Sequence, residues 1–537
     1  MPVAMGTRRF WRTRDGVRAV LIAGALFLTY AFFYQAGGWN QNSRFDSVRA
    51  VVDEHTLRID DYQANTGDKA LIDGHYFSDK APGLALVSVP PVAAARKTLD
   101  VVGIDPRSPK ALTILSYVAT LVGAAAPTAL TAFGIYWLAL RLGAKSAGAT
   151  FAAVAFGLAT PMWAYATLFW GHALTAALLF AGFAAAVCLR DRGSARRDVL
   201  LGALVGVAVG WATVSEFTSA LPAALIVGLA ATHVWERDGP LRARILTAAA
   251  GGAIACGVVL LVHNVVAFGS PFELGYSHEV NFPQQSQGFF GVGVPDFGVF
   301  REILYGRYRG LLFFAPVVIA APIGLFFLAK KTQLRPTVVV AALIPVYYLV
   351  INSGYALWDG GWVYGPRFLA PAFPFLCIPL AAVWTRVRVP WRVPLVALLL
   401  WGAGLSLVAE STTVQPPDVY KTPVSQLLWP SFRDSRFSLN TITFDEYGSE
   451  GPPLSVEDGK DRAAWNVGER LGLAGHGSLA PLFLVWLAAA VAWWLVGRTR
   501  PLRPPQPAVT EVSAPPVPDR SATPVPAARP EPRAGGP

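Results

Sequence analysis

Charged residues are scarce in this chain of 537 residues. Asp, Glu, Lys and Arg together make up 15% of it, whereas apolar residues make up 53%. Soluble domains carry about 25% charged residues and about 45–50% apolar residues. A water-soluble globular fold is therefore excluded, and the composition indicates a protein embedded in a membrane.

Cysteine is also scarce. The three cysteines, Cys188, Cys256 and Cys377, lie inside long apolar runs, where a thiol acts as a small hydrophobic side chain. A secreted scaffold held together by disulfides is therefore excluded. The sequence also lacks a Cys/His spacing typical of a metal centre, a glycine-rich phosphate loop and an internal repeat.

Long apolar runs, by contrast, are abundant. A helix needs about 20 mainly apolar residues to cross the hydrocarbon of a bilayer. Such runs occur near 17–36, 112–140, 146–164, 168–189, 198–214, 217–234, 244–267, 310–329, 336–352, 367–385, 391–409 and 479–497. The sequence thus predicts an all-α polytopic membrane protein with about twelve transmembrane helices.

The basic residues predict an orientation. The first apolar run follows several arginines and has no small-residue cleavage site, so we interpret it as a retained helix with a cytoplasmic N-terminus. Basic residues then recur in every second connection, for example over 190–197 and 386–392, as the positive-inside rule requires. The net charge of +11 is thereby explained without a nucleic-acid partner. We predict a protein of the plasma (inner) membrane with both termini cytoplasmic.

Four long connections fall on the opposite, external or periplasmic, side: 37–111, 268–309, 353–366 and 410–478. Long loops of mixed charge carry functional sites more often than short basic turns. We therefore predict a functional transmembrane region over 1–409, which includes the first external loop over 37–111. An external loop region over 410–478, a last transmembrane helix over 479–500 and a disordered, Pro-rich cytoplasmic tail over 501–537 follow it.

The first external loop contains the most informative pattern. Asp46, Arg49 and Asp53 follow one another at spacings of three and four, which places them on one face of a helix. Further on, Asp73-Gly74 predicts a tight turn. The segment Asp-Lys-Ala-Pro-Gly over 79–83 then begins a new element, because proline suits the first turn of a helix. We interpret 84–97 as a helix at the membrane surface, since counting it as a crossing would invert the charge pattern of every later loop.

The positions of Asp46, Arg49 and Lys80 resemble those in GT-C glycosyltransferases that use polyprenyl-phosphate sugars, such as protein O-mannosyltransferases and lipid A aminoarabinose transferases. In those families an acidic motif follows the first helix, often with an arginine, and Lys-Pro-Pro-Leu precedes a surface helix. Here Ser47 stands where many members have a second acid, and Ala81 where the first proline is usual. The resemblance implies a GT-C-like fold, a polyprenyl-phosphate-linked sugar as donor, and an acceptor on protein, lipid or envelope glycan.

The chemistry of such a transfer assigns a role to each of these residues. The donor leaves as a polyprenyl phosphate, so negative charge grows on a phosphate oxygen, and Arg49 and Lys80 are predicted to stabilise it. Asp46 is predicted to be the general base that takes the proton of the acceptor hydroxyl. A single displacement of this kind inverts the anomeric centre. A divalent metal ion that bridges Asp46 and the donor phosphate stays open as the one possible cofactor.

Later loops add further candidates. Arg367 lies at the start of an apolar run, where a cation needs an anionic partner, so we predict that it also binds the donor phosphate. Trp362 and Tyr364 are candidates for sugar binding, although an aromatic belt at the membrane interface explains them equally well.

Asp79, His278 and Glu279 complete the substrate-binding candidates; for His278 and Glu279, an ordinary hydrogen-bonding site in a loop is the alternative. His172 and Glu216 interrupt apolar sequence. We expect both of them to lie solvated near the external interface.

Two other functions compete with this prediction. A secondary transporter would place ionisable groups at mid-membrane and would often show repeats. A non-catalytic envelope assembly protein would not need Asp46, Arg49 and Lys80 to converge in space.

Overall fold

The computed structural model describes residues 10–286, 290–445, 462–498, 527 and 535–536. By its internal contacts the chain divides into a unit from Met1 to Gly497 and a unit from Arg498 to Pro537. The loop region predicted over 410–478 therefore belongs to the first unit. The predicted tail over 501–537 lies almost wholly outside the described residues.

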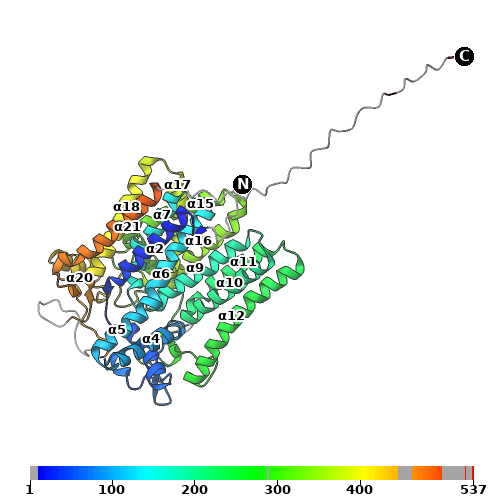
Figure 1. The fold of residues 1–537 in the computed structure, drawn as a ribbon. Coiled ribbons are helices and arrows are strands. Elements are labelled where there is room, and N and C mark those ends of the chain that lie inside the picture. The colour runs from blue at the N-terminus through cyan, green and yellow to red at the C-terminus, as the bar shows by residue number, and fades with distance from the viewer. Residues whose placement is uncertain (1–9, 287–289, 446–461, 499–526, 528–534, 537) are drawn as a thin grey trace. The chain divides into compact units, whose positions relative to one another are not determined.

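The described chain is almost entirely helical (Figure 1). The longer helices are α2 (Arg14–Ala31), α3 (Trp39–Arg49), α4 (Gly83–Val101), α5 (Pro109–Thr120), α6 (Ala126–Arg141), α7 (Ser146–Leu158), α9 (Gly171–Leu189), α10 (Ala195–Ser215), α11 (Ala220–Val234), α12 (Gly239–Phe268), α13 (Phe297–Tyr305), α15 (Ala321–Ala329), α16 (Arg335–Ser353), α17 (Phe373–Arg386), α18 (Val389–Thr412) and α21 (Ala480–Arg498).

Shorter helical turns connect these helices. The short α-helices are α8 (Met162–Ala166), α14 (Leu311–Phe314), α19 (Trp429–Arg433) and α20 (Val467–Arg470). Three π-helical turns are η1 (Ala50–Glu54), η3 (Leu121–Ala125) and η10 (Val424–Leu428). The 3-10 turns are η2 (Gln63–Asn65), η4 (Phe217–Ser219), η5 (Gly275–His278), η6 (Pro283–Ser286), η7 (Pro316–Ala320), η8 (Thr332–Leu334), η9 (Arg367–Ala372) and η11 (Gly475–Leu479).

The chain is a multi-pass membrane protein. Among the residues that the structure describes, nine helices are long and apolar enough to cross a membrane. Two further apolar helices, Ser146–Leu158 and Pro316–Ala329, are shorter, and α2 carries three charged residues within its 18 positions. The predicted count of about twelve crossings thus stays a prediction. The helix α4 is not among the nine, and its place at the membrane surface likewise stays a prediction.

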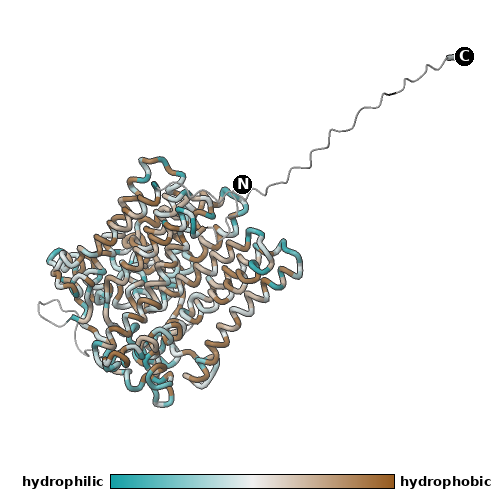
Figure 2. Tube along the Cα trace, in the orientation of Figure 1, coloured by the Kyte–Doolittle hydropathy of each residue, from teal (hydrophilic) through white to brown (hydrophobic). Residues whose placement is uncertain are grey.

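Hydropathy follows the same arrangement. In Figure 2 apolar residues run along the helices, and hydrophilic residues concentrate at their two ends. Of the nine candidate spans, α9 is the most enclosed, with 83% of its apolar window buried, whereas the figures for α12 and the span that contains α21 are 17% and 11%. The helix α9 is therefore central, while α12 and α21 lie at the periphery.

Close helix packing holds α10 against α12. A Cβ atom at Gly206 would lie 1.9 Å from the backbone oxygen of Ala249, and one at Gly202 would lie 2.5 Å from that of Ile245. Small residues spaced four apart let two membrane helices approach this closely. The packing therefore fixes the axis of α10, and with it the position of Glu216 immediately after the end of this helix.

Two small antiparallel sheets organise the loops. The strands β2 (Ala70–Ile72) and β3 (His75–Phe77) pair across the predicted turn at Asp73-Gly74, where both residues have positive φ. The strand β1 (Phe33–Tyr34) pairs with β4 (Trp465–Asn466). The Nδ2 atom of Asn440 also donates to the backbone oxygen of Gln35 at 2.7 Å. The loop region after α18 is thus fastened to the start of the first loop, at the left of the view in Figure 1.

Candidate functional site

A cavity of about 490 Å³ lies where the four long loops meet. Each of the loops predicted from the sequence contributes to its wall, as does the segment before α9. Its polar and aromatic lining residues are Trp39, Asn40, Asp68, Lys80, Trp170, Phe282, Gln285, Tyr355, Asp359, Trp362, Arg367, Phe368, Gln415 and Asp418. The cavity therefore combines two cations, three carboxylates and several aromatic faces.

Lys80 is the centre of a buried ion cluster in this wall. Its Nζ atom lies 2.5 Å from Oδ2 of Asp79 and 3.1 Å from Oδ2 of Asp68. Burial alone would lower the pKa of Lys80, but the two carboxylates outweigh burial and raise it above its ordinary value. Burial raises the pKa of Asp68, although Lys80 acts in the opposite direction. Lys80 thus remains a cation in the wall of the cavity.

Glu279 approaches this cluster from the second external loop. A β-bridge joins it to Ala70, so the loop is added to the edge of strand β2. The Oε2 atom of Glu279 and the Oδ1 atom of Asp79 are both buried without a hydrogen-bond donor. Burial, with the nearby Asp79, raises the pKa of Glu279 to about 10. The raised pKa favours the protonated form of Glu279, which can donate the hydrogen bond that the two oxygens lack.

His278 lies outside this cluster. Its Nε2 atom lies 2.8 Å from Oε1 of Glu273, and about a third of its side chain is exposed. Neither His278 nor Glu279 is among the residues that line the cavity. His278 thus forms a hydrogen bond within its own loop, and its predicted role in substrate binding stays a prediction.

Arg367 faces the cavity from the start of η9. Its Nη1 atom donates to the backbone oxygen of Gly360 at 2.8 Å, and its guanidinium lies 4.9 Å from the ring centre of Trp170 and 4.7 Å from that of Phe368. Its Nε atom is buried without a hydrogen-bond partner. Arg367 is therefore held in place through one nitrogen and retains donor capacity for an anion in the cavity.

The two aromatic candidates lie in different surroundings. Trp362 lines the cavity, and its Nε1 atom donates to Oδ1 of Asp418 at 3.2 Å. Tyr364 is fully buried, with its ring 4.8 Å from that of Phe314, and it does not line the cavity. The extended segment therefore presents Trp362 to the cavity and packs Tyr364 into the core.

Asp46 and Arg49 form a separate ion pair behind the wall of the cavity. The Nη1 atom of Arg49 lies 3.4 Å from Oδ1 of Asp46, and Nδ2 of Asn65 donates to the same oxygen at 3.0 Å. Asp46 is completely buried, and this burial raises its pKa to about 8. Arg49 also donates to the backbone oxygen of Phe444 at 2.9 Å. Neither Asp46 nor Arg49 lines the cavity that contains Lys80 and Arg367.

Asp53 lies in the π-helical turn η1, which continues the helix α3 after Arg49. Asp53 forms an ion pair with Arg96 of α4. This pair fastens the first loop to α4.

His172 and Glu216 are buried, not solvated as expected. Their side chains are 8% and 10% exposed, and Nδ1 of His172 lies 3.6 Å from Oε1 of Glu216. The expectation was wrong because α10 ends at Ser215 and the chain turns inward, towards the first loop. Both residues thus belong to the layer directly behind the cavity.

Three cavity carboxylates escaped the sequence analysis: Asp68, Asp359 and Asp418. They come from three different loops and share no motif, so no local signal marks them. Within the part of the chain that the structure describes, no group of three or more His, Cys, Asp or Glu side chains is arranged to hold a metal ion.

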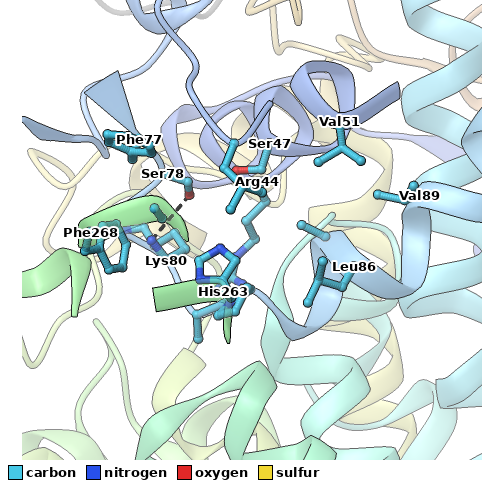
Figure 3. Close-up of a pocket in the computed structure, with 15 residues that line it drawn as sticks. Arg44, Ser47, Val51, Phe77, Ser78, Lys80, Leu86, Val89, His263 and Phe268 are labelled. Carbon is cyan, nitrogen blue, oxygen red and sulfur yellow. Dashed lines mark hydrogen bonds between the residues drawn. The ribbon is translucent and has the colours of Figure 1, made fainter. Parts of the chain in front are cut away.

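A second, much smaller cleft of about 20 Å³ also touches Lys80 (Figure 3). The side chains drawn around it include Val51, Leu86, Val89 and Phe268, which are apolar. Lys80 therefore lies between a polar cavity and an apolar cleft.

Comparison with known proteins gives similarity at the level of the fold. No protein-family model matches the chain, and no curated protein matches it in sequence. The structure is similar to ArnT from Cupriavidus metallidurans bound to undecaprenyl phosphate, with 16% identity and a TM-score of 0.46 over 78% of this chain and 70% of that one. It is also similar to ArnT from the same organism in the apo state, with 15% identity and a TM-score of 0.45 over 90% and 72%.

A third similar structure is the archaeal oligosaccharyltransferase AglB from Archaeoglobus fulgidus in complex with an inhibitory peptide and a dolichol-phosphate. The identity is 10% and the TM-score 0.43, over 82% of this chain and 61% of that one. ArnT and AglB are polyprenyl-phosphate-dependent GT-C glycosyltransferases, the class that the loop motif resembles. The identities and TM-scores are low, so we base the proposed function on the residues of this chain.

Proposed function

We propose that this protein is a membrane glycosyltransferase that moves a sugar from a polyprenyl-phosphate donor to an acceptor hydroxyl with inversion. The observation that carries the proposal is the cavity in which two cations, Lys80 and Arg367, face several aromatic rings and the carboxylate of Asp68. The cations match a phosphate, the aromatic rings match a sugar, and the carboxylate can accept the proton of the acceptor hydroxyl.

Lys80 and Arg367 would bind the donor phosphate. In the transfer the bond between the anomeric carbon and the phosphate oxygen breaks, and both electrons of this bond stay on the phosphate. Fixed cations in a largely enclosed site stabilise this charge without reorganisation of solvent. Arg367 offers a planar fork and Lys80 a point charge, so the two supply complementary contacts. Arg49, the other predicted phosphate ligand, would support the loop from behind.

Two carboxylates compete for the role of general base. Asp46 is the residue predicted from the sequence, but it is enclosed and does not line the cavity. Asp68 lines the cavity and contacts Lys80, and burial raises the pKa of both acids. We assign the base to Asp68. It would take the proton of the acceptor hydroxyl while the hydroxyl oxygen bonds to the anomeric carbon.

Sugar contacts would come from the aromatic wall and from the remaining acids. Trp362, Trp39 and Trp170 line the cavity together with Asp359 and Asp418. Flat ring faces pack against the C–H surface of a sugar, and carboxylates accept hydrogen bonds from its hydroxyls. We propose that the cavity opens to the external or periplasmic side, because all the basic connections lie at the other ends of the helices.

The test is release of polyprenyl phosphate from a panel of synthetic polyprenyl-phosphate sugars by the purified protein in detergent. We expect turnover of one donor, and a loss of about 10²–10⁴-fold in Asp68→Asn, the range for removal of a general base. Asp60→Asn is the matched control, since Asp60 lies in the same loop but contacts only the exposed hairpin residues His75 and Tyr76.

The outcomes separate the two assignments. A large loss in Asp46→Asn together with an active Asp68→Asn would return the base to Asp46. A parent protein that neither releases nor binds polyprenyl phosphate would refute the proposed function and favour a transporter or an assembly protein.

A further inference from the structure

Glu216 occupies a break between two helical segments behind the cavity. The helix α10 ends at Ser215, Glu216 is extended at φ −153° and ψ 114°, and η4 begins at Phe217. The carboxylate points into the protein, next to Gly171, where an added Cβ atom would lie 2.3 Å from Oε1 of Glu216. A glycine at this position thus leaves the room that the buried carboxylate fills.

Arg44 of α3 binds this carboxylate, a backbone carbonyl of the segment before α4 and a side chain of its own helix. Its Nη2 atom donates to Oε1 of Glu216 at 2.8 Å, its Nη1 atom to the backbone oxygen of Ala81 at 3.0 Å, and its Nε atom to Oδ1 of Asn40 at 3.1 Å. The side chain is 2% exposed. Each guanidinium nitrogen therefore contacts a different residue, and all three contacts are buried.

These contacts end at the wall of the cavity. Ala81 directly follows Lys80, and both Asn40 and Lys80 line the cavity. On the other side of Glu216, the ring of His172 packs edge-on against Trp170 and Phe368, at 6.2 and 5.8 Å between ring centres. Both of these rings also line the cavity.

We propose that Glu216 is a positioning residue which, through Arg44, sets the positions of Lys80 and Asn40 in the wall of the cavity. This inference rests on the proposed function of the cavity and deepens it. The ion pair connects the donor-binding loop to the end of α10, which is itself fixed by its packing on α12. The fixed position of α10 therefore determines, through Glu216 and Arg44, where Lys80 lies.

Stability alone does not account for this arrangement. A buried ion pair can often be replaced by well-packed apolar side chains without loss of stability. Here the arginine divides its three nitrogens among the buried carboxylate of Glu216, a backbone carbonyl beside Lys80 and an amide in the cavity wall. Groups that hold functional side chains from behind in this way fix their geometry, and such support is needed for a site to act.

A double variant distinguishes an effect on the position of Lys80 from an effect on the stability of the fold. In Arg44→Met/Glu216→Leu both charges are removed together, so no unpaired buried charge remains. We expect an unfolding midpoint in SDS above that of Glu216→Gln, which keeps an unpaired buried charge. We expect a kcat for polyprenyl-phosphate release about 100-fold below that of the parent, the effect of misplacing a reacting group by about 1 Å. Glu216→Gln alone should lower both the midpoint and kcat, because Arg44 keeps its charge.

The matched control is Asp198→Asn. Asp198 is a completely buried carboxylate in the first turn of the same helix, paired with Arg197 at 3.0 Å and with Arg237 at 3.3 Å. It lies about 27 Å along the helix from Glu216, at 1.5 Å per residue. We expect Asp198→Asn to lower the unfolding midpoint and to leave kcat unchanged.

A double variant with the kcat of the parent would overturn the inference. If the parent releases no polyprenyl phosphate, the proposed function fails, and cryo-EM maps of the parent and the double variant then decide the inference. A displacement of Lys80 by about 1 Å or more, the scale that matters for a reacting group, would support it. Identical positions of Lys80 and Asn40 in the two maps would refute it.

Discussion

Replacement of Lys80 by methionine tests the ion cluster most directly. Lys80→Met keeps the apolar stem but leaves the carboxylates of Asp68 and Asp79 without their shared cation, at side-chain exposures of 10% and 0%. Removal of one partner of a buried ion pair costs about 3–5 kcal/mol. We expect a loss of about this size for the two carboxylates together. It should not be twice as large, because a proton on one of the two acids relieves part of their repulsion. The assay is the free energy of unfolding in SDS at pH 7, followed by circular dichroism.

The pH dependence has a defined sign. Lys80 lowers the pKa of Asp68, which burial raises, so without Lys80 the pKa of Asp68 rises further in the folded state. The folded state then gains protons relative to the unfolded one. The stability of Lys80→Met should therefore recover as the pH falls towards the ordinary carboxylate range near 4. Adding Asp68→Asn and Asp79→Asn should restore stability at pH 7.

Lys69→Met is the matched control in the same loop. Lys69 donates only to Gln63, through a backbone oxygen and a side-chain oxygen, so its removal should cost about 0.5–1.5 kcal/mol. Equal losses for the two lysine variants, or a loss in Lys80→Met that does not change with pH, would refute the reasoning.

Three further variants test other contacts. Burial raises the pKa of Asp46 from 3.8 to about 8, so its contribution to stability is present below pH 3.8 and is lost as the pH rises to about 8. Asp46→Asn should not show this pH-dependent loss of stability. SDS unfolding of both proteins from pH 5 to 9 measures the difference. Glu279→Gln mimics the protonated acid and should shift stability at pH 7 by less than about 0.5 kcal/mol, whereas a large loss by the same measurement would contradict a protonated Glu279. Arg309 is fully buried and donates to the backbone oxygens of Asp359 and Gly361 at 2.7 and 2.6 Å. Arg309→Lys should cost about 2–4 kcal/mol in the same titration, because lysine lacks the planar fork that binds both carbonyls; an unchanged value would exclude this anchor.

Much of the fold can be predicted from the sequence because the bilayer restricts the structures that an apolar segment can adopt. A long apolar run has to form a helix, so the candidate spans follow the predicted runs closely. The boundary at Glu216 is different. A charge between two apolar runs indicates a break, but whether the carboxylate points outward or inward depends on Arg44, which is 172 residues away in sequence.

The candidate site was only partly predictable for the same reason. Lys80 stood out within the Asp-Lys-Ala-Pro-Gly segment that precedes a helix, and Arg367 because it begins an apolar run. Asp68, Asp359 and Asp418 carry no such mark, and only the closure of three loops brings them to one cavity. Burial likewise decides between Trp362 and Tyr364, two residues apart, and no periodicity in that segment reveals which of them faces inward.

The contacts of residues 33–37 with residues 440–442 and 465–466 have a consequence for biosynthesis. Asn440 and Gln35 are 405 positions apart, so at about 5–20 residues per second the ribosome needs about 20–80 s to complete this contact. During that interval the first loop lies outside the bilayer without the segment that binds Gly37 and Arg49. The cavity is consequently assembled last, after nearly all of the helices have been inserted. A nascent or truncated chain that ends before residue 440 would contain Lys80 and Arg367 but would lack Ile442 in the cavity wall and the contacts that Asn440 makes with Gln35 and Gly37.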